Sequence, residues 1–376
     1  MIYLDHAATT PMLDCVKQKM HETIDLGLGN ASALHSPGQY ASRLIQEARE
    51  HVARLINANS SEIIFTSGGS ESNNTVMHTF ASQDIAISAI EHPSAIEAAK
   101  VYAKHVEYIP VDQWGRISIQ HLPSNVQLVS VMMANNELGT LEPIQEIAQY
   151  YRQNAASHTY IHTDATQALG KIHIDVKALD VDYLTCSAHK IGGPLGIGLL
   201  YIKKGSPITP LIYGGHQEYR LRAGTSNVLG IVGFGEAAKW CWEHWSCKKY
   251  QEVKQLRDLL RQRILSEVPY SSANSPEGGC LPNILNMSFQ AAEGESIQLY
   301  LDAAGVAVST GSACAAGDLE PSYVIMATKK DAEVAHSSIR FSLGLDATSE
   351  DINQVMQVLP DIIGRLQGIS TIKVGD

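Results

Sequence analysis

The chain has 376 residues, enough for one large domain with a smaller one or for two domains of middling size. A hydrophobic content of 44% and a charged content of 18% are ordinary for a globular protein with a sizeable core. The net charge of −11 argues against nucleic-acid binding through a general basic field and leaves room only for a local basic patch.

The sequence shows no recognisable targeting signal and no paired spacing of its cysteines. No apolar run is long enough to span a bilayer, and the N-terminal MIYLDHAATTP lacks the charged-then-apolar pattern of a signal peptide. Six cysteines, at positions 15, 186, 241, 247, 280 and 314, show no paired metal-ligand spacing and suit a reducing compartment. We therefore expect a cytoplasmic protein with no membrane partner and no metal site.

In chain order, strands and helices alternate. A short apolar strand lies within residues 1–14, residues 30–38 form a loop, and a helix follows over residues 40–56. The alternation predicts an α/β fold with a mostly parallel sheet and helices on both faces. The expected strands are residues 62–66, 84–88, 106–109, 126–134, 160–163, 181–186 and 197–202.

The segment 234–268 is helical in pattern and carries Trp240, Trp242 and Trp245. It is typical of a bridge to a second, smaller domain. We expect a large domain of residues 15–255 and a small domain formed by residues 1–14 and 256–376.

Polar residues follow the predicted strands, and in open α/β sheets ligands bind at the carboxyl ends of the strands. Ser67 to Glu71 enter a helix, where backbone N–H groups and the Ser70 hydroxyl could hold a phosphate. Such turns are also common as simple helix caps. The other strand ends are followed by Glu91-His92-Pro93, by Asn135-Asn136-Glu137, by Asp164 and Gln167, and by Ser187, His189 and Lys190.

Lys190 stands between two expected buried strands in LTCSAHKIGGPLGIG, beside glycines that permit close approach to its backbone. A lysine is usually a solvated surface charge, but a desolvated lysine loses proton affinity and can form a Schiff base. A nucleotide phosphate loop does not fit, because the lysine precedes the glycines and no GK[ST] follows. We interpret Lys190 as a Schiff-base lysine.

Each of these residues taken alone has an ordinary structural role. Asp164 could cap a helix, His92 could be a core histidine, and Asn136 could be a turn residue. His158 and His162 have metal-ligand spacing only on a helix, whereas their segment reads as a strand. Together the groups predict a site for pyridoxal phosphate, which needs a lysine for its aldehyde and a carboxylate for its pyridine nitrogen.

The whole chain resembles the class V aminotransferase-like pyridoxal-phosphate enzymes of fold type I, and within them the cysteine desulfurases of the NifS/IscS group. The resemblance is carried by YLDHAATTP, SGGSESNN, EHPS, NNELG, HTDATQALGK, SAHKIGGPLGIG, RAGTSN, LPNILNMSF, STGSACAAGDLEPSYV and AHSSIRFSLG. Serine at position 70 replaces the family's usual threonine and keeps the hydroxyl. The resemblance implies a large domain with a seven-stranded type of sheet and a smaller α+β domain.

The resemblance also implies a role for each site residue. Lys190 would bind the cofactor, Asp164 its pyridine nitrogen, and His92 its ring, with a share in proton transfer. Arg340 would bind the substrate carboxylate, Cys314 would be the sulfur-accepting nucleophile, and Thr225 would reach the phosphate of the other subunit in a homodimer. The remaining cofactor contacts would be Gly69, Ser70, Ser187 and His189 at the phosphate and Asn136 and Gln167 at the polar edge of the ring, with Asn136 near the substrate as well.

From its own neighbours, Cys314 is a modest candidate. A cysteine is most often a small buried hydrophobe, but TGSACAAGD is too small and flexible to build a core, and reactive thiols need access. The stretch 310–320 resembles the long carrier loop of part of the family, and we expect it to be mobile.

The implied reaction converts L-cysteine into L-alanine and leaves the sulfur as a persulfide on Cys314. An acceptor protein would then take the sulfur for iron–sulfur cluster assembly, tRNA thiolation, DNA phosphorothioation or cofactor synthesis. A selenocysteine lyase or an aminotransferase on the same fold is the nearest alternative, although transamination needs no thiol. A non-catalytic sulfur-relay protein is less compatible with Lys190, Asp164, His92 and Arg340 together.

Overall fold

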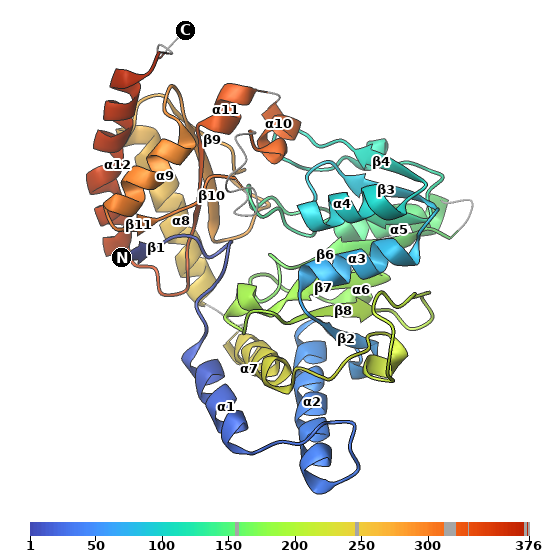
Figure 1. The fold of residues 1–376 in the computed structure, drawn as a ribbon. Helices are drawn as coiled ribbons and strands as arrows, with labels where there is room; N and C mark the ends of the chain where they lie inside the picture. The colour runs from blue at the N-terminus through green and yellow to red at the C-terminus, as the bar shows by residue number, and fades with distance from the viewer. Residues whose placement is uncertain (155–157, 245–247, 312–320, 330, 372–373, 375–376) are drawn as a thin grey trace.

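The computed structural model describes residues 1–154, 158–244, 248–311, 321–329, 331–371 and 374. Its centre is a seven-stranded sheet with strand order β2-β8-β7-β6-β5-β3-β4 (Figure 1). Only β8 runs antiparallel to its neighbours, so the expected mostly parallel α/β sheet is confirmed. The strands are β2 (Ile63–Thr66), β3 (Asp84–Ser88), β4 (His105–Ile109), β5 (Leu128–Ser130), β6 (Tyr160–Asp164), β7 (Tyr183–Ser187) and β8 (Gly198–Ile202).

The antiparallel direction of β8 follows from its short connection to β7. A parallel pair needs a crossover of a dozen or more residues, usually a helix. The connection holds only a short 3-10 helix, η3 (Ala188–Ile191), and a turn in which Gly192 and Gly196 have positive φ angles. The chain therefore reverses at once, and this reversal places Lys190 at the sheet edge.

Helices cover both faces of the sheet. Side chains of α2, α5 and α7 join the core on one face, and those of α3 and α4 join the core on the other. The helices of the first face are α1 (Asp14–Asp25), α2 (Ser36–Leu55), α5 (Ile144–Asn154), α6 (Val176–Leu179) and α7 (Val228–His244), and those of the second are α3 (Gly69–Thr79) and α4 (Pro93–Tyr102).

A second unit has its own hydrophobic core and a three-stranded antiparallel sheet of order β12-β10-β9. The N-terminal strand β1 (Ile2–Tyr3) joins this unit by pairing in parallel with β11 (Val306–Ala307), as Figure 1 shows. The other elements are α8 (Lys248–Glu267), β9 (Ser271–Ala273), β10 (Ile284–Phe289), α9 (Gly294–Ala303), α10 (Tyr323–Lys329), α11 (Ala332–His336), β12 (Ser338–Ser342) and α12 (Ser349–Ile369).

Helix α8 bears on where the large domain ends. Val253, Leu260 and Ile264 of α8 all pack in the core of the second unit. A boundary after residue 255 would divide this helix, so we propose that the division lies between α7 and α8. The single helical segment expected over residues 234–268 is two helices in the structure.

Strand β5 is shorter than the expected strand of residues 126–134. Beyond Ser130, the N–H groups of Val131 and Met133 still donate to carbonyls of the β6 segment. On the other side, the N–H of Met132 donates to the Glu91 carboxylate at 2.5 Å, so a side chain replaces the neighbouring strand. The ladder therefore ends early, and the apolar pattern alone could not reveal that replacement.

Helix α2 begins at Ser36, earlier than the expected residue 40. The His35 side chain accepts a hydrogen bond from the Gly38 N–H, and Pro37 occupies the first turn. Proline suits this position because N–H groups in the first turn have no hydrogen-bond partner within the helix, so the absence of an N–H costs nothing there.

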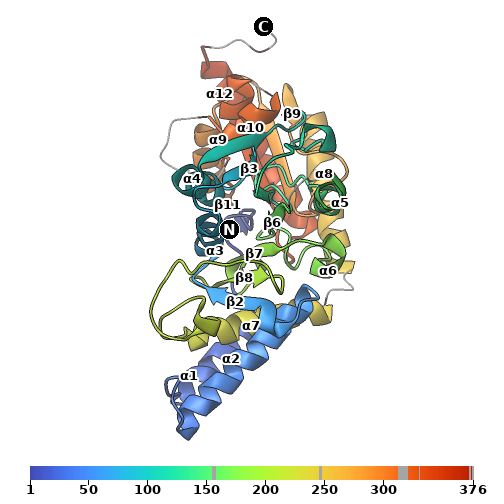
Figure 2. The ribbon, with the colours of Figure 1, turned by 90° about the vertical axis from the view of Figure 1, so that its right-hand side faces the viewer.

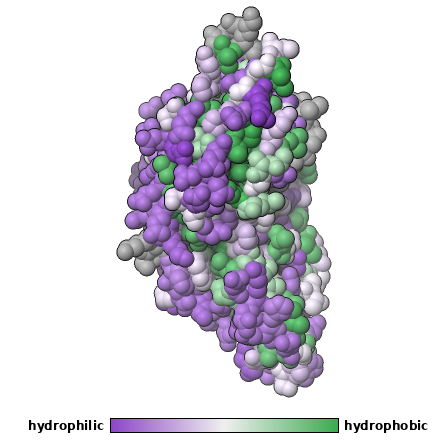
Figure 3. Space-filling model, turned by 90° about the vertical axis from the view of Figure 1, so that its left-hand side faces the viewer, coloured by the Kyte–Doolittle hydropathy of each residue, from purple (hydrophilic) through white to green (hydrophobic). Residues whose placement is uncertain are grey.

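Seen at 90° to the view of Figure 1, the molecule is elongated, with α1 and α2 at one end and α12 at the other (Figure 2). Figure 3 shows a face on which hydrophilic side chains predominate and hydrophobic ones form smaller areas between them. No helix among the described residues combines the length and the apolar character needed to cross a membrane.

Candidate active site

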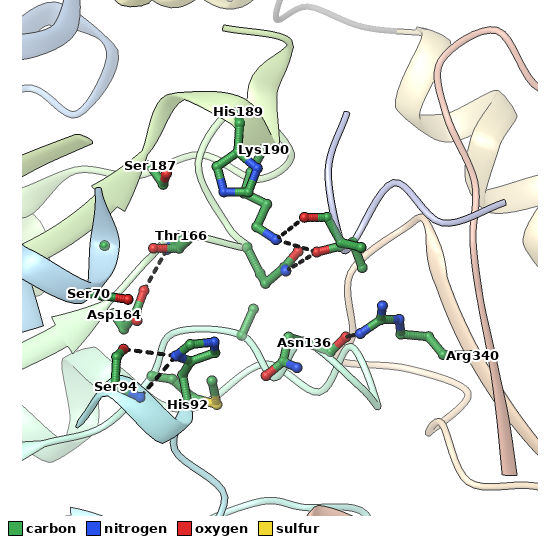
Figure 4. Close-up of a pocket in the computed structure, with 16 residues that line it drawn as sticks. Ser70, His92, Ser94, Asn136, Asp164, Thr166, Ser187, His189, Lys190 and Arg340 are labelled. Carbon is green, nitrogen blue, oxygen red and sulfur yellow. Dashed lines mark hydrogen bonds between the residues drawn. The ribbon is translucent and has the colours of Figure 1, made fainter. Parts of the chain in front are cut away.

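A cavity of about 220 Å³ lies at the carboxyl ends of β5, β6 and β7. The loops after these strands and the start of α3 form most of its wall, and the N-terminal segment and β12 close it (Figure 4). The cavity is lined by Ala7, Ala8, Gly69, Ser70, His92, Ser94, Met132, Ala134, Asn136, Asp164, Thr166, Gln167, Ser187, His189, Lys190 and Arg340.

Lys190 is held at the cavity by main-chain carbonyls. All five residues of β7 are buried, and η3 directly after it turns the lysine toward the N-terminal segment. The ammonium donates to the carbonyl oxygens of Ala7 at 2.5 Å and Ala8 at 2.7 Å (Figure 4). These two bonds fix the position of an amine that lines the cavity.

Asp164, the last residue of β6, is buried, and both of its carboxylate oxygens accept hydrogen bonds. Oδ1 accepts from the Thr166 N–H and Oδ2 from the Asn73 side chain, each at 2.9 Å. Asp164 thus fixes the turn after the strand, as a capping aspartate would, and also lines the cavity.

His92 is linked to Asp164 through two side chains. It caps α4, where its Nδ1 accepts from the Ser94 N–H at 3.2 Å and contacts the Ser94 hydroxyl at 2.8 Å (Figure 4). Asn73 donates to both the Ser94 hydroxyl and Asp164. Asn73 and Ser94 were not predicted as site residues from the sequence, although Asn73 lies one helical turn after Gly69 and so on the same face of α3.

The start of α3 forms a tight cradle of backbone groups. A Cβ on Gly69 would lie 3.2 Å from the Thr166 hydroxyl, and a Cβ on Gly198 would lie 2.6 Å from the Cα of Gly68. Only glycine at position 198 lets β8 approach the loop that leads into α3. Ser70 follows in the first turn, where N–H groups favour an anion.

His189 is a neutral ring beside this cradle. Burial, together with the charges of Lys190 and Lys171, lowers its pKa to about 4. Its Nδ1 contacts the Thr9 hydroxyl at 3.2 Å.

Arg340 reaches the cavity from β12 and is almost fully buried. Its Nη2 donates to Asp5 at 2.9 Å and its Nη1 to the carbonyl of Asn136 at 3.1 Å. The Arg340 Nε and the Asn136 Oδ1 are buried without a hydrogen-bond partner among the described residues. The Asp5 partner was not anticipated from the sequence.

Gln167 and Lys171 form a buried pair behind Lys190. The Gln167 side chain donates to the Ala7 carbonyl at 2.9 Å, and Lys171 donates to the carbonyl of Gln167 at 3.0 Å and to its Oε1 at 3.2 Å. Burial, together with the charge of the nearby Lys190, lowers the pKa of Lys171 to about 7. We did not single out Lys171, although it stands four residues after Gln167.

Ten of the expected site residues therefore meet at one cavity. Thr225 does not line it: this exposed residue lies at a separate hollow with Ser67, Glu218 and Arg222. Cys314, with the rest of residues 312–320, lies outside the described residues. The ten that line the cavity are Gly69, Ser70, His92, Asn136, Asp164, Gln167, Ser187, His189, Lys190 and Arg340.

Comparison with known proteins identifies similar chains over nearly the full length. The family model of aminotransferase class-V matches residues 2–355. The cysteine desulfurase IscS of Dictyoglomus turgidum is 43% identical, over 99% of this chain and 97% of that protein. The cysteine desulfurase NifS of Azotobacter vinelandii is 38% identical, over 98% and 94%.

Solved structures agree with this similarity. A NifS-like protein from Rickettsia africae superposes with a TM-score of 0.89 at 35% identity, covering 97% of this chain and 99% of that one. SspA in complex with cysteine superposes with a TM-score of 0.79 at 32% identity, covering 91% and 99%.

Proposed function

Because the chain belongs to the class-V aminotransferase family, in the group of pyridoxal-phosphate enzymes that includes the cysteine desulfurases, we propose that it converts L-cysteine into L-alanine. The sulfur remains on Cys314 for transfer to an acceptor. The names of its relatives support this activity, and the cysteine bound to SspA supports the substrate.

The cavity has the groups that pyridoxal phosphate requires. The Asn136 Oδ1 and the Thr166 Oγ1 are buried without partners among the described residues, and both residues line the cavity. The first turn of α3 suits the phosphate, and the Asp164 carboxylate suits the pyridine nitrogen. Bound there, the cofactor supplies an aldehyde for amines and a protonated ring that accepts the electron pair of a broken C–H bond.

The residues of the chain then divide the work. Lys190 would hold the cofactor, and the Lys190 amine, once free, or His92 would take the α-proton of the substrate. Asp164 would keep the proton on the ring nitrogen, and the hydrogen bonds through Asn73 and Ser94 fix the position of His92 relative to Asp164. Arg340 would offer the substrate carboxylate its Nε, which has no hydrogen-bond partner in the described part of the chain.

Sulfur transfer requires the Cys314 thiolate. It attacks the sulfur of the bound substrate, an S–S bond forms, and the C–S bond breaks. Returning protons to the carbon skeleton gives alanine, so that L-cysteine and the Cys314 thiol become alanine and the Cys314 persulfide without any added oxidant.

The observation that carries this proposal is the convergence of Lys190, Asp164 and Arg340, from two separate cores, on one cavity. Borohydride reduction of the purified enzyme, followed by peptide mapping, should locate the reduced cofactor on Lys190. Labelling of a different lysine, or of none, would refute the assignment.

The wider setting belongs to the same proposal. The enzyme acts as a homodimer in the cytoplasm, with Thr225 contacting the cofactor phosphate of the partner subunit and with an acceptor protein receiving the sulfur. The exposure of Thr225 away from its own chain's cavity supports the shared site.

A further inference from the structure

The buried Glu137 carboxylate binds the residue on one side of the stretch that carries Cys314 and lies close to the residue on the other side. Glu137 is 1% exposed, and its Oε2 accepts a hydrogen bond from the Ser322 hydroxyl at 2.5 Å. Gly311 lies close to the same atom, because a Cβ built on Gly311 would be 3.1 Å from Oε2. Gly311 precedes Cys314 in the sequence and Ser322 follows it, so the two flanks converge on one carboxylate.

Glu137 itself stands on a firmly held loop. The N–H groups of Glu137 and Leu138 donate to the Asn135 Oδ1 at 2.9 and 2.8 Å, and the Asn135 amide donates to the Ile90 carbonyl at 3.1 Å. The preceding carbonyl, that of Asn136, accepts from Arg340. Glu137 therefore directly follows the residue whose carbonyl binds Arg340.

A second contact ties the same flank to the cavity wall. The Tyr323 hydroxyl donates to the carbonyl of Glu91 at 2.6 Å, directly before His92. The Ser322 hydroxyl also accepts from the Ile325 N–H at 3.2 Å, which caps the start of α10. The beginning of α10 is thus joined to the loops of both His92 and Asn136.

A carboxyl group in this position is expensive to bury. Burial raises the pKa of Glu137, and the Ser322 bond and the charges of Arg340 and His92 oppose that rise only in part. Its second oxygen, Oε1, has no hydrogen-bond partner among the described residues. A buried acid whose charged form is costly points to a role at the atoms it contacts.

We propose that Glu137 is a positioning residue that fixes the two flanks of the Cys314 stretch beside Arg340. This inference rests on the proposed function, since it takes Cys314 as the thiol that attacks the substrate sulfur. Glu137 acts through Gly311 and Ser322 and does not itself exchange protons with the substrate.

The test compares Glu137→Gln, Ser322→Ala, the double variant and Ser322→Thr in the cofactor-loaded enzyme. The readout is the rate of Cys314 alkylation by iodoacetamide, followed by peptide mass spectrometry with Cys280 as internal reference. The matched control is an exposed pair of the same chemistry, Ser296 with Glu293, changed to Ser296→Ala and Glu293→Gln.

We expect each single variant to raise Cys314 alkylation about threefold or more and to lower kcat for alanine formation, while the cofactor absorbance stays unchanged. The double variant should match the larger of the two single effects, because each change removes the same hydrogen bond between Ser322 and Glu137. Ser322→Thr keeps the hydroxyl and should restore the wild-type rate, and the control pair should have no effect.

Alkylation rates equal to wild type, additive effects in the double variant, or no rescue by threonine would overturn the inference. If Glu137→Gln fails to fold, the Cys314 alkylation rates of Ser322→Ala and Ser322→Thr are sufficient to test the inference. Failure of the proposed function has a different signature: the wild-type enzyme would form no alanine, while the alkylation comparison would stay readable.

Discussion

At the scale of single residues, Lys171 shows how the site destabilises the fold that holds it. Its folded pKa of about 7 lies below the ordinary lysine value of 10.5. Between these values the unfolded chain binds a proton that the folded chain does not, so the titration of Lys171 makes stability rise with pH. Below about pH 7 the full penalty of burying the charge is present.

We therefore predict that Lys171→Met stabilises the cofactor-free protein by about 2 to 4 kcal/mol at about pH 6, with the gain shrinking toward zero near pH 10. Urea unfolding at several pH values measures this. The exposed Lys177 provides the control. We expect that the effect of Lys177→Met on the urea unfolding midpoint does not change with pH. A gain independent of pH would show that Lys171 is not a buried charge.

Asp164→Asn should keep the fold but lower kcat and kcat/KM together by about 100-fold. A neutral amide cannot hold the pyridinium proton, and its NH₂ group would face the donor of Asn73 or of Thr166. Alanine formation and circular dichroism check the two halves of this prediction. Near-normal alanine formation would reduce Asp164 to a structural cap.

Residues that follow buried strands could be predicted from the sequence, because strand ends meet at one sheet edge. Asn73, Ser94 and Lys171 act through other side chains, so their positions in the sequence did not indicate a chemical role, even where helical spacing placed them near the site. The Asp5 partner of Arg340 depends on β1 pairing with β11, which is distant in the sequence.

At the scale of elements, the approach of β8 to the start of α3 depends on Gly198. Gly198→Ala would force a methyl group into the Cα of Gly68, and we expect a loss of about 1 to 3 kcal/mol with weaker cofactor binding. Denaturant unfolding and cofactor titration measure the two effects. Gly364→Ala in α12 is the control, because its Cβ meets open space and should stabilise the helix. Unchanged cofactor affinity in Gly198→Ala would show that the position of β8 does not affect cofactor binding at the start of α3.

Short apolar runs predicted the strands, and helical spacing of apolar residues predicted the helices. The residues at which these elements begin and end were harder to predict. Strand β5 ends where the Glu91 carboxylate takes the place of a strand, and α2 begins where His35 provides a cap. Both boundaries are set by side chains, which hydrophobic periodicity does not register.

At the scale of the whole molecule, the site is proposed to be shared between two subunits. Mixing a Lys190→Ala chain with a Thr225→Ala chain should yield heterodimers in which one site carries neither change and the other carries both. Recovery of alanine formation on mixing is the expected result. If Thr225 served the cavity of its own chain, mixing would recover nothing.

The most direct test of the central claim is mass spectrometry of the enzyme after a single turnover with L-cysteine and no acceptor. We predict one alanine released per extra sulfur atom found, with that sulfur on the peptide containing Cys314 and removed by a small thiol. Alanine without sulfur on Cys314, or sulfur bound to another cysteine, would contradict the account.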